Sequence, residues 1–527
     1  MQLFLTFLTY TLFVAGYSWY KLRKETLSSQ EGYFLGGRSL TGVVIAGSML
    51  LTNISTEHLI GMNGSSYKNG FIIIAWEVTS ALALILTAVY FVPKYLKMGL
   101  TTIPQFLENR FDGFTRSLVA FFLMISFIVT LLPIVLYTGA INLESIFNVS
   151  ELLDVSQDQG MNITIWAIGL IGSFYAIFGG LKAVAISDTL NGYGLLIGGL
   201  AIPFLALLSI GDGNPMEGLI KVYQNAPKKF NVIGAKDSVM PFEVLFTGLI
   251  INQIYFWCMN QMIIQRALGA KNLKEAQKGL LLTGLLKILV PLIIILPGVI
   301  GFYYYGDLFY DRQDMIYPEL IKRVLPVGFV GIFAAVVMGA VLSTFNSVLN
   351  SAATIFSIDI FKRHIDPKVS DARLVKIGKT TSAVLALFAI TVAPMVANAP
   401  DGLYQLLQQL NGIFFIPIAS IMLAGFFLPN ISALAAKAAL WVGLAFYIGC
   451  TIIFKVDLHF VHIWGIEFIL NMTVMGVISY YIPKEKPFEI KDLQIVEMTG
   501  WKYTKSFSAF LVVATLFIYI LLGNFST

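Results

Sequence analysis

Residues 42–62 read GVVIAGSMLLTNISTEHLIGM, and this stretch decides the architecture that we expect for the whole chain. It is long enough to cross a bilayer as a helix, which needs about 20 mostly apolar residues. Its centre carries the polar run from Thr52 to His58, whose short side chains bond to nearby backbone and weaken a helix. Unwound backbone at membrane depth is tolerated where it lines a cavity. We therefore predict a membrane helix broken near Asn53; the alternative is an intact helix whose polar face packs on its neighbours.

The composition supports a membrane protein. Of 527 residues, 57% are hydrophobic and 12% are charged, against about 25% charged in soluble domains. The net charge of +5 is small, and no basic stripe interleaved with aromatics predicts a nucleic-acid partner. Two cysteines predict neither a disulfide framework nor a zinc site. No catalytic motif appears, so we expect a protein that is not an enzyme and has no cofactor apart from a coupling ion.

About fourteen membrane-spanning helices are predicted, in an all-α polytopic protein with a single transport domain over 1–527. We expect the first apolar segment to be retained as a span and not cleaved as a signal peptide. The expected spans lie near 1–20, 42–62, 70–93, 115–139, 161–180, 184–209, 242–264, 279–304, 326–358, 377–398, 403–427, 433–454, 460–482 and 505–523.

The orientation follows from the short basic loops. Clusters of Lys and Arg follow the first, third, seventh, ninth and thirteenth expected spans, and all fall on one side of the membrane. The loop 140–160, on the other side, contains neither Lys nor Arg. Because basic short loops stay in the cytoplasm, both termini are expected outside. We expect a multi-pass protein of the cell (inner) membrane, of bacterial origin.

Charged side chains inside the expected spans indicate a functional centre, because each costs at least about 2.5–3.5 kcal/mol at the bilayer middle. Glu77 and Ser80 are three residues apart and lie on one helical face. Lys287 is the lone charge in the apolar run 280–300, and Glu77 is its natural partner. The alternative is an ion pair between helices that touches no ligand.

Neutral oxygen ligands are expected on the ninth span. Ser343, Ser347 and Asn350 form a stripe at helical spacing, beside Thr344. Such stripes often only pack helices together. Next to the free carbonyls of a broken second span, they would suit a monovalent cation better than Ca²⁺ or Mg²⁺, which favour carboxylates.

Amides and aromatics complete a set that suits a sugar, with its many hydroxyls and apolar ring face. Most of these aromatics, taken singly, would be ordinary packing residues. The set comprises Gln405, Gln408 and Asn411 beside Tyr404, Asp188 with Asn191, and Gln253, Phe256 and Trp257.

Four ordered motifs resemble the sodium:solute symporter family, and within it the sodium/glucose and sodium/galactose branch. The resemblance extends from about 33 to 428, and its motifs are 53–57, 179–184, 265–271 and 350–356. It implies a LeuT-like fold of two inverted five-helix repeats with unwound first helices. The implied parts are a leading helix and loop over 1–41, repeat 1 over 42–209, repeat 2 over 242–427 and peripheral helices over 433–527.

The resemblance also implies the residues of the site. Sodium would bind carbonyls of Leu51, Ile54 and Ala340 and the hydroxyls of Ser343 and Thr344. A second sodium site, or an ion exit route, would use Asp188, Asn346 and Ser347. The gates would be Met62, Trp76, Phe256 and Tyr404. The sugar-binding set would be Asn53, His58, Glu77, Ser80, Gln253, Phe256, Trp257, Lys287 and Gln408.

Three positions depart from the pattern of that branch. His58 stands where bacterial members have glutamine, Phe256 lacks the hydroxyl of the usual inner-gate tyrosine, and Gln253 replaces asparagine. In the second ion set, Asn346 replaces a hydroxyl.

The function predicted is uptake of a neutral hexose resembling galactose or glucose, driven by inward Na⁺ flow through alternating access. The expected partners are therefore a sugar, Na⁺ and the lipid bilayer, and no oligomer is required. Alternatives are Na⁺ symport of myo-inositol, sialic acid, an amino acid or a vitamin, and a sugar sensor that does not transport. A carboxylate cargo would be repelled by Glu77, which favours a neutral polyol.

Overall fold

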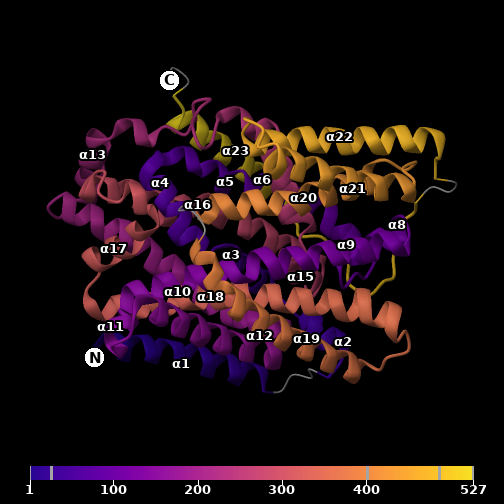
Figure 1. Cartoon of the computed structure of the whole chain (residues 1–527), viewed down its shortest axis with the longest axis horizontal. Helices are drawn as coiled ribbons and strands as arrows, with labels where there is room; N and C mark the ends of the chain where they lie inside the picture. The colour runs from indigo at the N-terminus through magenta and orange to yellow at the C-terminus, as the bar shows by residue number, and fades with distance from the viewer. Residues whose placement is uncertain (1, 24–27, 399–402, 485–487, 525–527) are drawn as a thin grey trace.

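The computed structural model describes residues 2–23, 28–398, 403–484 and 488–524, and within these ranges it contains helices and no strand ladder. The long helices run roughly side by side along the longest axis of the molecule (Figure 1). Short helices gather at the end that carries the N-terminus, where α11, α13 and α17 lie. The all-α architecture expected from the sequence is confirmed.

The described part of the first half of the chain contains thirteen helices, some of which divide an expected span or lie between spans. They are α1 (Gln2–Leu22), α2 (Gln30–Leu35), α3 (Gly42–Asn53), α4 (Asn63–Asn69), α5 (Ala75–Val78), α6 (Ser80–Leu86), α7 (Val92–Lys97), α8 (Ile103–Arg110), α9 (Gly113–Ile125), α10 (Leu132–Phe147), α11 (Val149–Leu153), α12 (Gln157–Ile210) and α13 (Pro215–Asn225).

The second half begins with another interrupted span. Its helices are α14 (Gly248–Ile254), α15 (Gln261–Leu268), α16 (Leu273–Tyr305), α17 (Ile316–Val324), α18 (Val327–Ile355), α19 (Asp371–Val392), α20 (Leu403–Phe427), α21 (Ala433–Ile448), α22 (Phe460–Tyr481) and α23 (Thr504–Leu522).

The number of long apolar helices differs from the fourteen expected. Among the described residues, ten helices are long and apolar enough to cross a membrane, and two shorter apolar helices, Gly42–Asn53 and Gly248–Met259, accompany them. These two shorter helices are parts of the expected spans 42–62 and 242–264, which are interrupted. The expected spans 161–180 and 184–209 correspond to the two parts of α12 on either side of a kink at Gly180, and of these only the second part is among the ten. The expected first span is helix α1, which is also outside the ten.

Gly180 forms the kink at which the two helical parts of α12 meet. Gly180 has φ +59° and ψ −171°, a conformation that residues with a side chain rarely adopt. A Cβ atom there would also lie 2.8 Å from the carbonyl oxygen of Tyr33. Glycine therefore lets the two halves of α12 change direction against the chain that precedes α3.

The break predicted in the second span is confirmed. Helix α3 ends at Asn53, Ile54 is extended with φ −85° and ψ 92°, and a wider π-helical turn, η2 (Glu57–Met62), leads into α4. The span at 242–264 is interrupted in a similar way, because α14 passes through the π-helical turn η8 (Tyr255–Met259) to an extended Asn260. Both interruptions lie in the first helices of the two repeats that the resemblance implies; the boundaries of those repeats stay a prediction.

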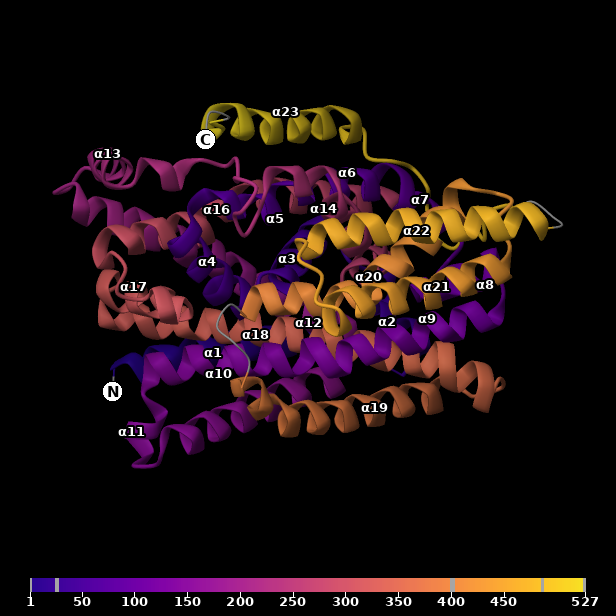
Figure 2. The same cartoon turned by 45° about the horizontal axis from the view of Figure 1, so that its top comes forward.

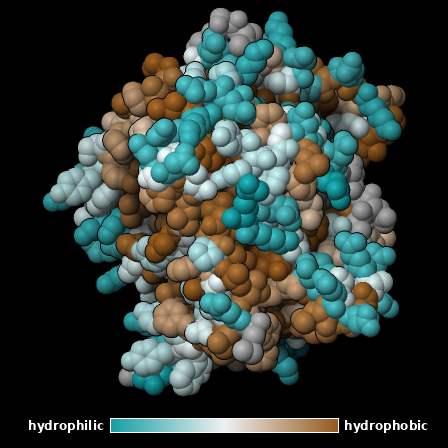
Figure 3. All heavy atoms as spheres, turned by 90° about the vertical axis from the view of Figure 1, so that its left-hand side faces the viewer, coloured by the Kyte–Doolittle hydropathy of each residue, from teal (hydrophilic) through white to brown (hydrophobic). Residues whose placement is uncertain are grey.

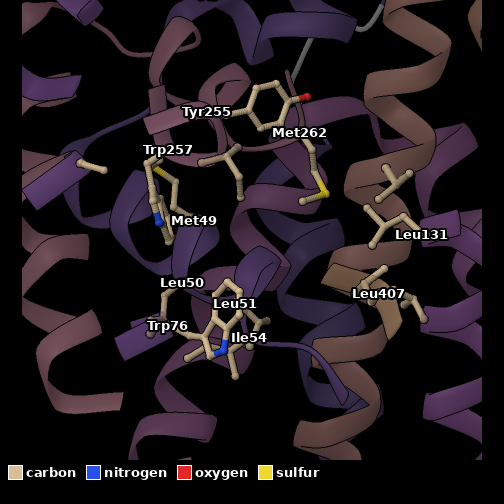
Figure 4. Close-up of a cluster of buried hydrophobic side chains, with 14 of the residues drawn as sticks. Met49, Leu50, Leu51, Ile54, Trp76, Leu131, Tyr255, Trp257, Met262 and Leu407 are labelled. Atoms are coloured by element: carbon tan, nitrogen blue, oxygen red, sulfur yellow. The ribbon is translucent and has the colours of Figure 1, made fainter. Parts of the chain in front are cut away.

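The core of the molecule surrounds the first break. Met49, Leu50, Leu51 and Ile54 are fully buried, and Figure 4 shows them close to Trp76 and Trp257. Peripheral helices cover this core: α23 and α19 lie at opposite edges in Figure 2. The end face drawn in Figure 3 mixes hydrophilic and hydrophobic patches. The polar side chains of the site, such as Asn53, Glu77 and Lys287, are buried in the interior of this apolar bundle.

Candidate ion and substrate site

The break in the second span frees two backbone carbonyls. The amide of Ser55 donates to the carbonyl of Asn53 (3.2 Å), and the amide of His58 donates to that of Ser55 (3.1 Å). In a regular helix these amides would bond to Leu51 and Ile54, four residues earlier. The carbonyls of Leu51 and Ile54, two of the predicted sodium ligands, therefore lack their usual helical donors.

Helix α18 places its hydroxyls against this break. The Thr344 hydroxyl donates to the carbonyl of Thr52 (2.9 Å), and the hydroxyls of Thr52 and Ser347 are 3.1 Å apart. Ala340, Ser343 and Thr344 are all buried. The predicted sodium set thus lies where α3 meets α18. Its neutral oxygen atoms suit a monovalent cation, and the described residues contain no cluster of His, Cys, Asp or Glu suited to a divalent metal.

The second predicted ion set has a fixed cation beside it. Asp188 accepts a hydrogen bond from the Ser48 hydroxyl (2.6 Å), and Arg266 lies 3.8 Å from the same carboxylate oxygen. Arg266 also donates to the Ser347 hydroxyl. Its guanidinium therefore compensates the charge of Asp188 in the interior, a role that the sequence did not reveal. Asn346 is buried nearby on α18.

A narrow cavity of about 50 Å³ lies beside the break, enough for roughly four water molecules. All of the residues predicted to bind sugar line it, and Thr344 of the sodium set lines it too. The other members of the sodium set, and Asp188, Asn346 and Ser347, do not reach this cavity. The structure therefore brings the predicted substrate set together and places the two ion sets behind its wall.

An ion pair occupies the middle of the cavity wall. Lys287 contacts the carboxylate of Glu77, and its ammonium donates to the Asn53 side chain (2.6 Å). His58 lies 3.8 Å from the other oxygen of Glu77. The partner expected for Lys287 is thus present, and the pair ties α16 to the segment from Ala75 to Val78 and to the broken end of α3.

Gln253 connects several residues of the cavity wall next to Glu77. Its amide nitrogen donates to the carbonyl of Trp76 (2.7 Å), and its amide oxygen accepts from the Ser80 hydroxyl (3.1 Å) and the Trp257 indole (3.1 Å). Gln408, which also lines the cavity, donates to the Tyr404 hydroxyl (2.8 Å). These amides hold aromatic rings and hydroxyl groups in fixed positions around the cavity.

Aromatic rings close one side of the cavity. The Tyr404 ring lies 5.2 Å from that of His58 and 5.8 Å from that of Trp76, both edge to face. Phe256 lines the cavity from η8 and packs edge to face on Trp257 at 5.2 Å. Met62 is buried but does not line the cavity, so three of the four predicted gate residues meet there.

The cavity also contains residues that the predicted substrate set omitted. Asn252 and Asn260 line it, and each has one buried side-chain atom without a hydrogen-bond partner, Oδ1 of Asn252 and Nδ2 of Asn260. They stand four residues before and after Phe256, so helical spacing from Phe256 was the signal that could have found them. Glu57 and Asn411 line the cavity as well.

Comparison with known proteins places these features in context. A family model described as "Sodium:solute symporter family" matches residues 33–443. The uncharacterized symporter YidK of Escherichia coli strain K12 is 45% identical over 521 residues, covering 99% of this chain and 91% of the relative. The sodium/glucose cotransporter of Vibrio parahaemolyticus is 34% identical over 426 residues, covering 77% of this chain and 76% of the relative.

A solved structure shares the fold at low sequence identity. It is a Na⁺-coupled sialic acid symporter in a substrate-bound outward-open state, with a TM-score of 0.78 and 19% identity over 93% of this chain and 99% of that one. At this identity the similarity supports the fold alone.

Proposed function

The chain belongs to the sodium:solute symporter family, and from this premise we propose that it takes up a neutral hexose, resembling galactose or glucose, by symport with Na⁺. As a member of that family it is a membrane-spanning transporter and not an enzyme, and sodium-coupled uptake of a small solute is its activity. The proposal concerns the cargo and the residues that bind it.

The observation that carries the proposal is the composition of the central cavity. Its wall combines the Glu77–Lys287 pair, the amides of Gln253 and Gln408, and the ring of Trp257. A carboxylate and amide oxygens accept hydrogen bonds from sugar hydroxyls, an ammonium donates to them, and an aromatic face packs on the apolar side of the sugar ring. Two carboxylates, Glu57 and Glu77, line the cavity with one lysine, which disfavours a cargo that carries a carboxylate, such as sialic acid or an amino acid.

The ion is proposed to bind between the carbonyls of Leu51 and Ile54 and the hydroxyls of Ser343 and Thr344. Because Thr344 lines the cavity and also donates to Thr52, an ion bound there would fix the broken end of α3 next to the sugar. Coupling of this kind is typically worth about 1–3 kcal/mol and is reciprocal, so sugar would also raise the affinity for sodium.

The cycle is proposed to be alternating access. The open space of about 50 Å³ is less than a hexose occupies, so Trp76 and Tyr404, the outer gate, must move apart for sugar to enter, and Phe256, the inner gate, must then move for sugar to leave toward the cytoplasm. One charge moving inward gains about 2.3 kcal/mol per 100 mV of membrane potential, which adds to the sodium gradient.

The test is uptake of labelled galactose, glucose and myo-inositol into proteoliposomes, with and without an imposed inward Na⁺ gradient. We expect gradient-dependent accumulation of a hexose. Accumulation of myo-inositol alone would favour the second candidate, which the 30% identity to the sodium/myo-inositol cotransporter of Bos taurus supports. Uptake of none of the three by protein that binds sodium would refute a neutral polyol cargo.

A further inference from the structure

A groove of about 770 Å³ lies on the outside of the bundle, between α19, the π-helical turn η10 (Phe356–Ile365) and the end of α9. Most of its wall is apolar, with Met124, Phe361 and Val384 among the lining residues. Val384 is 60% exposed, and α19 forms an outer edge of the molecule in Figure 2. In a membrane this groove would face the acyl chains of the surrounding lipid.

One end of the groove is basic. Arg373 and Lys376 line it from the first two turns of α19, three residues apart and therefore on one face of the helix. Thr380 and Val384 continue the same face at helical spacing into the apolar part of the groove. The groove thus places two cations at one end of a slot that is otherwise apolar.

Neighbouring charges leave these two cations accessible. Lys362 donates to the Gln30 side chain (2.9 Å) and Arg363 contacts Glu108, so both are directed elsewhere. Arg373 contacts Asp366 at 3.3 Å, in an exposed pair of the kind that contributes little. Lys376 is exposed and, within the described ranges, has neither an ion pair nor a hydrogen bond from its side chain.

We propose that this groove binds an anionic phospholipid, with its phosphate between Arg373 and Lys376 and one acyl chain along α19. Both cations lie in the segment 362–379, which the positive-inside rule assigns to the cytoplasmic surface. Basic pockets between membrane helices on that surface suit anionic head groups, and long Lys and Arg side chains reach the interface while their stems pack on apolar surface. A soluble phosphate would gain nothing from the apolar slot, so the groove selects a lipid.

The experiment measures lipid binding by native mass spectrometry of the full-length protein in detergent, titrated with phosphatidylglycerol or phosphatidylcholine of identical acyl chains. We expect phosphatidylglycerol to bind more tightly. The double variant Arg373→Gln/Lys376→Gln should lose roughly 5- to 30-fold in affinity for phosphatidylglycerol and little for phosphatidylcholine. Thr380→Trp should fill the slot and weaken binding of both lipids.

The matched control is Lys271→Gln/Lys274→Gln. These lysines are exposed and have the same spacing in sequence; Lys274 lies in the first turn of α16, Lys271 lies just before that helix, and neither lines the groove. The control should keep the affinity of the unaltered protein for phosphatidylglycerol. Equal losses in the two double variants, or equal binding of the two lipids by the unaltered protein, would overturn the proposal. Because the assay needs neither sodium nor sugar, its failure would leave the proposed transport function untouched.

Discussion

Replacing Glu77 by glutamine tests both the observed role of this carboxylate as the partner of Lys287 and its proposed role as a ligand for sugar. Both side chains are 1% exposed, and the substitution removes the negative charge while keeping the shape. Lys287 would keep its hydrogen bond to Asn53 but lose its ion-pair partner.

The expected cost to stability follows from this burial. Removing one member of a buried pair leaves an uncompensated charge and costs about 3–5 kcal/mol. Glu77→Gln and Lys287→Met should each lower the free energy of unfolding by about that amount, whereas the double variant removes both charges and should cost far less. Thermal unfolding in detergent, followed by intrinsic tryptophan fluorescence, measures the four members of this cycle.

Sugar binding should respond differently from stability. The double variant lacks both the carboxylate and the ammonium that are proposed to bind sugar, and a hydrogen bond to a charged group contributes about 1.5–3 kcal/mol. The double variant should therefore bind hexose at least roughly 10-fold more weakly even though its fold is restored. Equilibrium binding of labelled sugar to the purified protein measures this change. A double variant that is stable and binds hexose like the unaltered protein would refute the ligand role and leave Glu77 a structural residue. If the double variant instead lost as much stability as the two single variants together, the energetic coupling of the pair would be refuted.

Three further predictions test other parts of the molecule. Thr344→Val removes the hydroxyl beside the broken helix and should raise the sodium concentration for half-maximal uptake roughly tenfold or more, whereas Thr344→Ser should preserve it; equal sodium dependence of the two variants would contradict the ion assignment. Burial lowers the pKa of Lys229, in the loop after α13, from 10.5 to about 8. As pH rises, the folded protein therefore releases this proton before the unfolded chain does, and the free energy of unfolding should rise between pH 8 and pH 10.5. Lys229→Met should remove this rise in the free energy of unfolding. A variant whose stability depends on pH as that of the unaltered protein does would contradict the assignment to Lys229. A Cβ atom on Gly61 would lie 3.0 Å from Cβ of Tyr404, so Gly61→Val should keep Tyr404 from closing over the cavity. Uptake should fall at least tenfold while sodium binding survives. Normal uptake by this variant would show that the close approach of Gly61 to Tyr404 is not needed for closure.

Much of the fold and part of the site followed from local sequence. The apolar runs predicted the membrane helices, and the polar run from Thr52 to His58 predicted the break after Asn53, because side chains that bond to their own backbone act within one helical turn. The pairing of Lys287 with Glu77, 210 positions apart, was also predictable, because a lone cation in an apolar span requires an acidic partner.

Only the tertiary structure decided which faces of the helices meet. The contacts of Arg266 with Ser347 and with Asp188, and the close approach of Gly61 to Tyr404, depend on how whole helices are rotated and packed. Hydropathy and helical spacing fix which residues share a face of one helix, but the neighbour of that face is set by the sum of many weak contacts along its length.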